Sequence, residues 1–408
     1  MGAEGVNDSG RERERDRDAP PPPGTEEAPV SEEENGDDVE PSFFADPKRL
    51  VQTLLAVVVI VVAIYFLLPT VVGVEDGIAT LGRGEPFWIV VAILLSVAMF
   101  GSYVALFRGV VGENVVDLSL RESYEITLAG LAATRLFSAG GAGGIVLTYW
   151  ALRKAGMPRK ISAARMVAFL VLLYAVYMLA LVIFGVLLRV GVLPGPAPFG
   201  LTVIPASIAG GVIVVFLLIA LIPGDLERRF SGASQERRRG RIARRLATVP
   251  ATLAIGTRTA IEFARDHSRG GLALIGAIGF WAANIGILWA SFKAFGADIP
   301  LGVVVQGFFV GMVANLIPFA PGGVGAVDAG MIGTFVLFDV PGVTGGTIFA
   351  AVLTYRLIAF WLPIPPGIVA FFQLRRTVAR WERERPGPGV GSDIAESLPG
   401  SITSESKV

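Results

Sequence analysis

The apolar segment from residue 301 to 338 is interrupted at its centre by residues that break helices. Leu301–Ile317 and Val324–Phe338 are apolar, yet the stretch from Asn315 to Asp328 reads Asn-Leu-Ile-Pro-Phe-Ala-Pro-Gly-Gly-Val-Gly-Ala-Val-Asp. Proline removes a backbone donor and breaks a helix. Freed backbone groups at membrane depth are tolerated only where they are buried in protein or line a wet cavity. This stretch therefore predicts the working centre of a membrane transporter.

Composition supports a membrane-embedded, all-helical chain. The sequence is 53% hydrophobic and 17% charged, and it contains 50 glycines, as is typical of polytopic helical membrane proteins. It has no cysteine and a single histidine, His267, which excludes disulfides, thiol chemistry and a metal centre of clustered Cys and His. We expect no metal and no cofactor.

Enzymatic motifs are missing from the sequence. The glycines at 144 and 325 are followed by Ile-Val-Leu and Ala-Val-Asp, so neither glycine stretch is a nucleotide-binding loop, which requires Gly-Lys-Ser/Thr. No Ser/His/Asp or paired-carboxylate arrangement has a suitable spacing. We therefore expect no catalytic residues, no enzyme activity and no nucleic-acid partner.

Charge and hydropathy divide the chain into five regions. Residues 1–46 carry fifteen acids and four arginines, a net charge of −11, so this part cannot bury enough apolar surface to fold alone. The predicted regions are a disordered acidic tail (1–47), a first membrane half (48–224), a basic cytoplasmic loop (225–269), a second membrane half (270–380) and a disordered C-terminal tail (381–408).

Positive charges predict the topology. Lysine and arginine gather after alternate apolar blocks, and such residues mark cytoplasmic loops. We expect about six full spans, with both termini cytoplasmic and the chain in the plasma membrane. The expected spans are 50–68, 87–107, 166–188, 201–222, 271–292 and 345–374.

Two further apolar blocks are predicted to form broken hairpins. Basic loops flank 126–152 on both sides, so this block is expected to enter and leave on the cytoplasmic face, with its break at Ser138–Gly144. Each arm has about a dozen residues, roughly 18 Å of helix, which is too short for a hydrocarbon core of about 30 Å. The 301–338 block is expected to open from the other face, as a re-entrant hairpin or as two short crossings.

Two pairs of motifs indicate an internal repeat. Gly140-Gly-Ala-Gly143 aligns with Gly322-Gly-Val-Gly325, and Arg165-Met-Val-Ala-Phe169 aligns with Arg356-Leu-Ile-Ala-Phe360. The second half then carries an insertion of nine residues. Hairpins that open to opposite faces would form an inverted repeat, an arrangement that allows one half to rock against the other around a midplane site.

Five polar residues within the apolar blocks are candidates for the substrate site. Asp328 is interpreted either as a substrate- or proton-coupled carboxylate or as a structural partner of an arginine or of backbone amides. Arg356 lies about eleven residues into its span, roughly 16 Å deep, and is expected to face an anion or Asp328. Arg165 either binds the substrate or extends its charged end to the membrane surface. Arg135 either clamps a phosphate or stabilises helix ends, and Asn315 either binds or satisfies carbonyls freed by Pro318.

The glycine stretches add backbone to the predicted site. Helices that start after Gly144 and after Gly325 would point their N-terminal dipoles toward the midplane, which favours an anionic group such as a lipid phosphate or a carboxylate. The predicted substrate-binding glycines are Gly140, Gly141, Gly143, Gly322, Gly323 and Gly325.

The 315–328 stretch, together with Tyr355-Arg356 downstream, resembles the flippase-like transmembrane family, which includes the membrane region of lysylphosphatidylglycerol synthases. The resemblance covers roughly residues 50–380. Asp328 stands where the family often has glutamate, and Ile-Val-Leu follows Gly144 where the family usually has a proline and a charged residue. The synthases also carry a soluble aminoacyl-transfer domain. Because only a short polar tail follows residue 385, we do not expect lipid aminoacylation.

The resemblance implies a lipid flippase or permease that moves an anionic phospholipid or a lipid-linked sugar between leaflets by alternating access. A secondary transporter of a small solute or ion, using the same midplane site, is the first alternative. A non-transporting membrane partner of an envelope-assembly enzyme, recruited through the charged tail, is the second. If the chain is a lipid flippase, its expected partner is a membrane lipid with an anionic headgroup.

Overall fold

The computed structural model describes residues 82–112, 116–136, 142–221, 257–258, 261–262, 267–316 and 323–384, and these residues contain helices and no strand. The predicted acidic tail and the predicted span 50–68 lie outside the described residues. So do the centres of both predicted breaks, residues 137–141 and 317–322.

Within the residues that the structure describes, five helices are long and apolar enough to cross a membrane. They are α5 (Pro86–Val111), α8 (Arg159–Arg189), α9 (Phe199–Leu221), α12 (His267–Ala294) and a continuous segment that consists of α15 (Gly345–Arg356), a π-helical turn η4 (Leu357–Trp361) and α16 (Ile364–Glu384). The predicted all-α polytopic membrane fold is thereby confirmed.

Five shorter elements form two helical pairs. One pair is α6 (Leu120–Leu136) and α7 (Ala142–Lys154). The other is α13 (Leu301–Met312), which continues into the 3-10 turn η2 (Val313–Leu316), and α14 (Ala326–Phe338). We call the first pair the α6–α7 hairpin and the second the α13–α14 hairpin. Their re-entrance, and the internal repeat, stay predictions.

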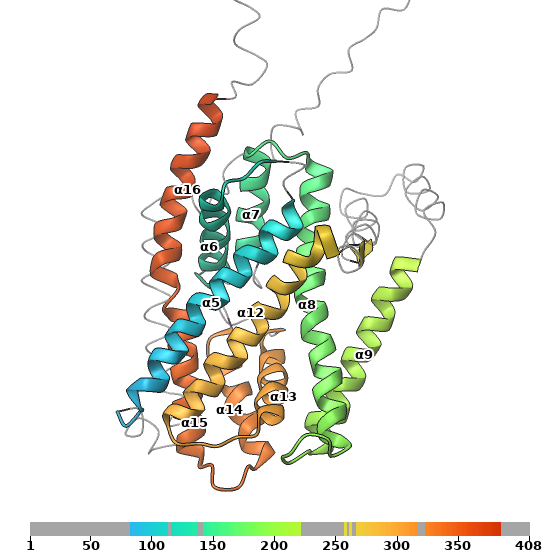
Figure 1. The fold of residues 1–408 in the computed structure, drawn as a ribbon, viewed down its shortest axis with the longest axis vertical. Helices are drawn as coiled ribbons and strands as arrows, with labels where there is room; N and C mark the ends of the chain where they lie inside the picture. Colours follow the sequence, from blue (N-terminus) through green and yellow to red (C-terminus); the bar gives the residue numbers. More distant parts are fainter. Residues whose placement is uncertain are drawn as a thin grey trace, which may run out of the picture. The chain divides into compact units, whose positions relative to one another are not determined.

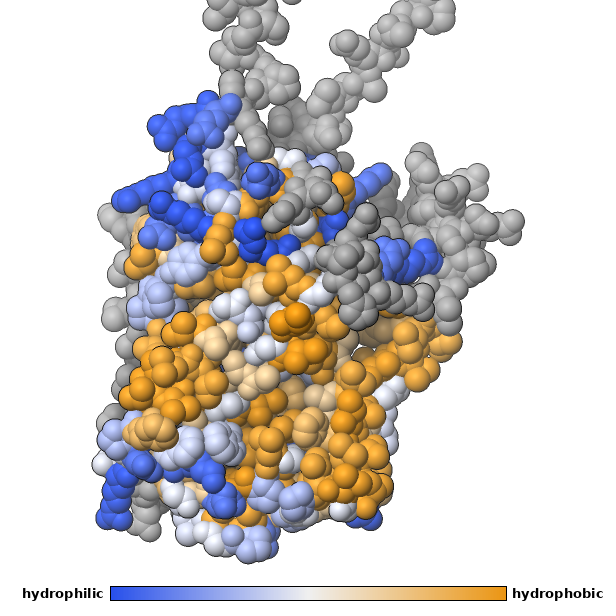
Figure 2. All heavy atoms as spheres, viewed as in Figure 1, coloured by the Kyte–Doolittle hydropathy of each residue, from blue (hydrophilic) through white to orange (hydrophobic). Residues whose placement is uncertain are grey.

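The surface of the helices matches a lipid environment. On α5, Val90, Leu94 and Val97 are 54–66% exposed, and their spacing places them on one face of the helix. Figure 2 shows a hydrophobic surface between hydrophilic ends. Large exposed apolar surfaces are avoided by soluble proteins, but in a bilayer they face lipid chains at no cost.

The two hairpins lie at opposite ends of the long helices (Figure 1). Glu122, in the first turn of α6, accepts hydrogen bonds of 3.1 Å from Arg380 Nη2 and Trp381 Nε1, near the end of α16. Gly302, at the start of α13, packs instead against Leu193 in the loop between α8 and α9. We call the start of α6 and the start of α13 the bases of the two hairpins. Helix α8 runs from one end of the long helices to the other, so the two bases lie at opposite ends of the molecule.

Three predicted boundaries are wrong by a few residues. Helix α6 begins six residues before 126, and its start is stabilised where Ser119 and Glu122 hydrogen-bond each other. Helix α7 begins at Ala142, not after Gly144. Helix α16 extends to Glu384, into the predicted 381–408 tail, because Trp381 is buried and bonded to Glu122.

Candidate substrate site

The start of α14 is built around Asp328. Gly325 is the N-cap residue with φ of 82°, a conformation that favours glycine. Asp328 Oδ2 accepts a 2.8 Å hydrogen bond from the backbone N–H of Gly325. A carboxylate in the first turn also interacts favourably with the positive end of the helix dipole. The predicted helix start after Gly325 is confirmed, and Asp328 is the residue that caps it.

The other oxygen of Asp328 pairs with Arg356, the last residue of α15. Arg356 Nε lies 2.7 Å from Asp328 Oδ1, and the two side chains are 4% and 2% exposed. The predicted counter-charge of Asp328 is therefore confirmed. An isolated charge at this depth would be very costly, so each ion depends on the other.

Arg135, in the last turn of α6, reaches across to the π-helical turn η4. This turn interrupts the α-helical hydrogen bonding of the last segment, and we call it the break between α15 and α16. Its Nη1 and Nη2 atoms each donate a 2.9 Å hydrogen bond, to the carbonyls of Phe360 and Ala359. Pro363 has no N–H to offer the Ala359 carbonyl four residues earlier. Here the chain forms the wider turn η4, in which Leu362 N–H bonds the carbonyl of Leu357. Arg135 thus has the predicted helix-end role, toward a helix far away in the sequence.

The ring of Phe360 contacts the guanidinium groups of both Arg135 and Arg356. Its centroid is 4.2 Å from Arg356 Cζ and 5.3 Å from Arg135 Cζ, and both distances allow cation–π attraction. Phe360 also shares an apolar cluster with Leu136, Val324 and Ile364. Leu136 ends α6 and Val324 precedes α14, so described residues next to both breaks meet here.

Asn315 lies against the same start of α14. The Oδ1 atom of Asn315 is 2.6 Å from the position that a Cβ atom on Gly323 would occupy. Gly323 has φ of 70°, so both space and backbone conformation require glycine at this position. Asn315 is exposed and is one of the residues that line the cavity described next.

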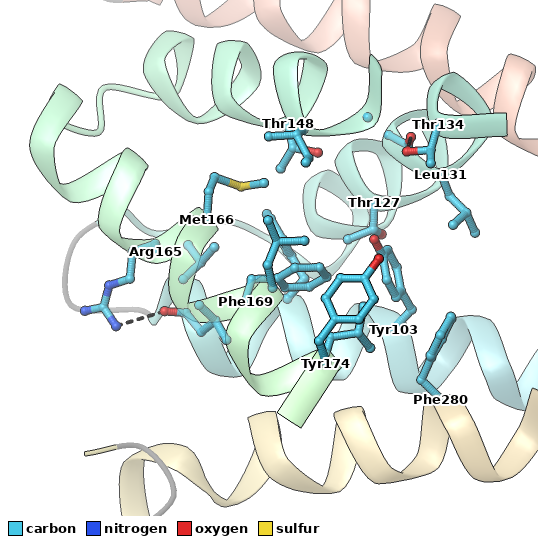
Figure 3. Close-up of a pocket in the computed structure, with 18 of the residues that line it drawn as sticks. Tyr103, Thr127, Leu131, Thr134, Thr148, Arg165, Met166, Phe169, Tyr174 and Phe280 are labelled. Carbon is cyan, nitrogen blue, oxygen red and sulfur yellow. Dashed lines mark hydrogen bonds between the residues drawn. The ribbon is translucent and has the colours of Figure 1, made fainter. Parts of the chain in front are cut away.

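A cavity of about 290 Å³ lies between α5, α6, α7, α8 and α12. It combines apolar and aromatic walls with hydroxyl groups, and Figure 3 shows those of Thr127 and Tyr174 turned toward each other. Arg165 lies at one end, where its Nη1 donates a 2.9 Å hydrogen bond to the Val110 carbonyl. No carboxylate is among the described residues that line it. We call it the inner cavity; its polar lining residues are Tyr103, Thr127, Thr134, Thr148, Arg165, Tyr174 and Asn315.

Close contact between α6 and α7 forms one wall of the inner cavity. Gly144 faces Gly130 so closely that a Cβ atom on Gly144 would overlap the Gly130 carbonyl and the Thr134 hydroxyl. Gly144 therefore serves as a packing residue inside α7. Gly143 lies in the first turn of α7, while Gly140, Gly141 and Gly322 lie outside the described residues.

The predicted site residues fall into two groups. Asp328, Arg356 and Arg135 converge on the break between α15 and α16, whereas Arg165 and Asn315 line the inner cavity. Phe360 and the cavity hydroxyls are site residues that were not predicted from the sequence. Pro363 could have indicated the position of Phe360, because a proline within a helix leaves a carbonyl on the preceding turn without its usual donor. Among the described residues, no group of three or more His, Asp or Glu is placed to hold a metal ion.

These observations define a multi-pass helical membrane protein in which charged residues of two hairpins meet within the apolar region. The sequence matches the family described as the lysylphosphatidylglycerol synthase TM region over residues 53–367. The chain belongs to this family, as the sequence resemblance predicted.

Two relatives come from Methanothermobacter thermautotrophicus, and both are described as UPF0104 membrane proteins. One is 33% identical over 118 residues, which cover 29% of this chain and 29% of the relative. The other is 29% identical over 120 residues, which cover 29% of this chain and 35% of the relative. The chain therefore spans about a third of the length of these curated relatives.

Proposed function

We propose that this protein moves an amphipathic lipid, an anionic phospholipid or a lipid-linked sugar, between membrane leaflets by alternating access, and that it is a transporter and not an enzyme. One observation carries the proposal. The buried Asp328–Arg356 pair of the α13–α14 side and Arg135 of the α6–α7 hairpin meet at the break between α15 and α16. Charged residues within membrane segments mark transport pathways.

The lining of the inner cavity supports a lipid as the cargo. Arg165 and the hydroxyl groups of Tyr103 and Tyr174 can donate to a phosphate or to sugar hydroxyls, and no carboxylate is among the described residues that line the cavity. Phe107, Phe169 and Phe280 supply apolar walls for the adjoining hydrocarbon. Ligand pockets typically combine such walls with a few placed polar groups.

The Asp328–Arg356 ion pair and Arg135 can couple movements of the two hairpins to the last span, which consists of α15, η4 and α16. Asp328 belongs to α14 and Arg356 ends α15, while Arg135 of α6 holds the next turn of the same segment. A movement of either hairpin therefore changes the environment of the segment Arg356–Phe360. We propose that this segment is the pivot around which the two halves rock.

We further propose a plasma-membrane location with the C-terminal end of α16 in the cytoplasm. The end of the molecule that holds the base of the α6–α7 hairpin is rich in basic residues, whereas the described residues at the other end balance Arg83, Arg189 and Lys293 against Glu85, Asp298 and Asp339. Basic residues favour the cytoplasmic side. The basic residues of the first end include Arg108, Arg121, Arg153, Lys154, Arg159, Lys160, Arg375, Arg376 and Arg380.

Reconstitution tests the proposed function. Proteoliposomes with a headgroup-labelled anionic phospholipid, or with a labelled polyprenyl-linked sugar, should show leaflet exchange with the wild-type protein and strongly reduced exchange with Asp328→Asn. No exchange of either lipid by the wild-type protein, or equal exchange by the variant, overturns the proposal. Flux of a small anion or cation without lipid exchange would favour the solute transporter, and neither activity would favour the non-transporting partner.

A further inference from the structure

A second cavity lies on the opposite half of α8 from the inner cavity. It has a volume of about 330 Å³ and lies between α8, α12 and α13. Among the described residues, every side chain that lines it is apolar, in contrast to the hydroxyl-bearing inner cavity. We call it the outer groove; its lining residues on α8 and α13 are Val176, Ala180, Phe184, Leu301, Val305 and Phe309.

Helix α8 connects the two spaces. Arg165 and Tyr174 on α8 line the inner cavity, and Val176, Ala180 and Phe184 further along the same helix line the outer groove. From Arg165 to Phe184 the helix rises roughly 28 Å, close to the hydrocarbon thickness of about 30 Å. Together the two spaces therefore follow α8 through the thickness of a membrane.

Trp281 of α12 lines both the inner cavity and the outer groove. Its side chain is buried, and its Nε1 donates a 2.7 Å hydrogen bond to the Leu173 carbonyl of α8. Its ring contacts those of Tyr177 and Phe309 edge-on, with centroids 5.3 and 5.5 Å away. The Tyr177 hydroxyl in turn donates to the Phe309 carbonyl. Rings from α8, α12 and α13 thus close the space between the two cavities.

We propose that the inner cavity and the outer groove are two halves of one lipid path along α8 and α12, and that Trp281 is the partition that separates them. The inner half receives the headgroup, because it carries the donors, and the outer groove receives hydrocarbon. Phe309 belongs to the α13–α14 hairpin, so a movement of that hairpin would break the Tyr177–Phe309 hydrogen bond and release the Trp281 ring. The assignment of cargo rests on the proposed function, whereas the partition rests on the two cavities alone.

Crosslinking with a reactive lipid tests the partition. The chain has no cysteine, so Thr148→Cys in the inner cavity and Ala180→Cys in the outer groove each provide a single thiol. A phosphatidylethanolamine with a maleimide on its headgroup is used for Thr148→Cys, and a phospholipid with a maleimide on its acyl chain is used for Ala180→Cys. Each is added to one face of proteoliposomes of known protein orientation. In the wild-type background, each cysteine should react mainly with lipid from its own leaflet.

Removal of the ring should allow reaction from the opposite leaflet. With Trp281→Ala, lipid added to the outer-groove face should label Thr148→Cys about tenfold faster, which corresponds to about 1.4 kcal/mol of barrier. Tyr177→Phe, which loses only the hydroxyl group, should give a smaller increase and covers the case in which Trp281→Ala fails to fold. Trp150→Ala is the matched control, because Trp150 is also buried but lines neither cavity.

The outcomes separate the partition from the proposed function. Faster labelling with Trp281→Ala or Tyr177→Phe, without a change in Trp150→Ala, supports the partition even if wild-type protein exchanges no lipid in bulk. Equal labelling in all backgrounds, or the same increase in Trp150→Ala, overturns it. Failure of both cysteines to react from either leaflet also overturns it, because neither space would then admit a lipid.

Discussion

The two hairpins use their polar residues in different ways. In the α13–α14 hairpin, the carboxylate of Asp328 is buried against Arg356 and caps its own helix. In the α6–α7 hairpin, the charge of Arg135 is directed at backbone carbonyls of another helix, and hydroxyl groups face a cavity. One hairpin therefore contributes the carboxylate of a charge pair, and the other contributes three of the hydroxyl groups around an open space.

The two halves are therefore not interchangeable, even where their glycine motifs align. A carboxylate that already has an arginine and a backbone partner is poorly placed to take a ligand without giving up one of them. The inner cavity, in contrast, has room for a headgroup. We therefore expect ligand contacts mainly at the α6–α7 hairpin and conformational coupling mainly at the α13–α14 hairpin, and the following variants test that division.

The largest effect is expected from breaking the buried ion pair on one side. Arg356→Gln leaves Asp328 as an uncompensated buried charge, which should lower the stability by about 3–5 kcal/mol, measured as a shift of thermal or denaturant-induced unfolding in detergent. The double variant Asp328→Asn/Arg356→Gln removes both charges and should recover most of that loss. Lipid exchange should stay low in both variants if the pair couples the hairpin to the last span.

The double variant distinguishes coupling from a purely structural role. If it regains both stability and lipid exchange, the charges serve only to hold α14 against α15. Phe360→Leu is a useful companion, because it removes the ring that both arginines contact but leaves the ion pair in place.

A smaller loss is expected at the α6–α7 hairpin. Arg135→Ala removes two hydrogen bonds from a charged donor to the carbonyls of Ala359 and Phe360, and should cost about 1.5–3 kcal/mol. Hydrogen exchange of the backbone should increase locally around the break between α15 and α16. Unchanged exchange there would show that η4 is held by other contacts. Arg135→Lys should recover only part of the loss, because lysine lacks the planar fork of arginine.

Glycine substitutions compare the packing of the two hairpins. Gly144→Ala forces a Cβ atom into the Gly130 carbonyl, whereas a Cβ atom on Gly333 of α14 meets no neighbouring atom within 4 Å. Overpacking should make Gly144→Ala destabilising by about 1–3 kcal/mol. Gly333→Ala should be neutral or stabilising by up to about 1 kcal/mol, because alanine favours a helix interior. Unfolding midpoints of the two variants in the same detergent provide the test, and equal midpoints would contradict the tight α6–α7 contact.

The long apolar segments and the break of the α13–α14 hairpin could be predicted from the sequence because each depends on local composition. The apolar spans required only hydropathy, and the start of α14 followed from Gly325 and Asp328. The partner of Asp328 was also accessible, because a second charge at membrane depth must be compensated and Arg356 was the nearest candidate by depth.

Other features depend on residues far apart in the sequence, and no local pattern contains them. Arg135 is more than 220 residues from the carbonyls that it bonds, so the sequence could indicate that it needed partners but not which. The inner cavity has walls from five helices, and Trp281 is one apolar residue among many in α12. The early start of α6 was missed because Glu122 and Glu125 lower its hydropathy, although both are bonded to α16.

The smallest predicted effect concerns the base of the α6–α7 hairpin and depends on pH. Partial burial opposes ionisation of Glu122, but hydrogen bonds from Ser119 and Trp381 and the charge of Arg380 outweigh it, so the pKa of Glu122 is held below its ordinary value of 4.5. A depressed pKa in the folded state stabilises the fold above the unfolded pKa, and this contribution is lost as the pH falls through the folded pKa.

Glu122→Gln should therefore reduce stability at neutral pH by at most about 1 kcal/mol, since the Arg380 side chain is 51% exposed and exposed ion pairs contribute little. Below pH 4.5 the wild-type protein and the variant should converge as the carboxylate becomes protonated. Unfolding midpoints of both proteins across this pH range provide the measurement, with Glu382→Gln as a control for the neighbouring Lys154 contact. A constant difference at all pH values would mean that the shape of Glu122, and not its charge, holds α6 against α16. The contact of Glu122 with α16 would then be fixed by packing, in contrast to the buried ion pair that attaches α14 to α15.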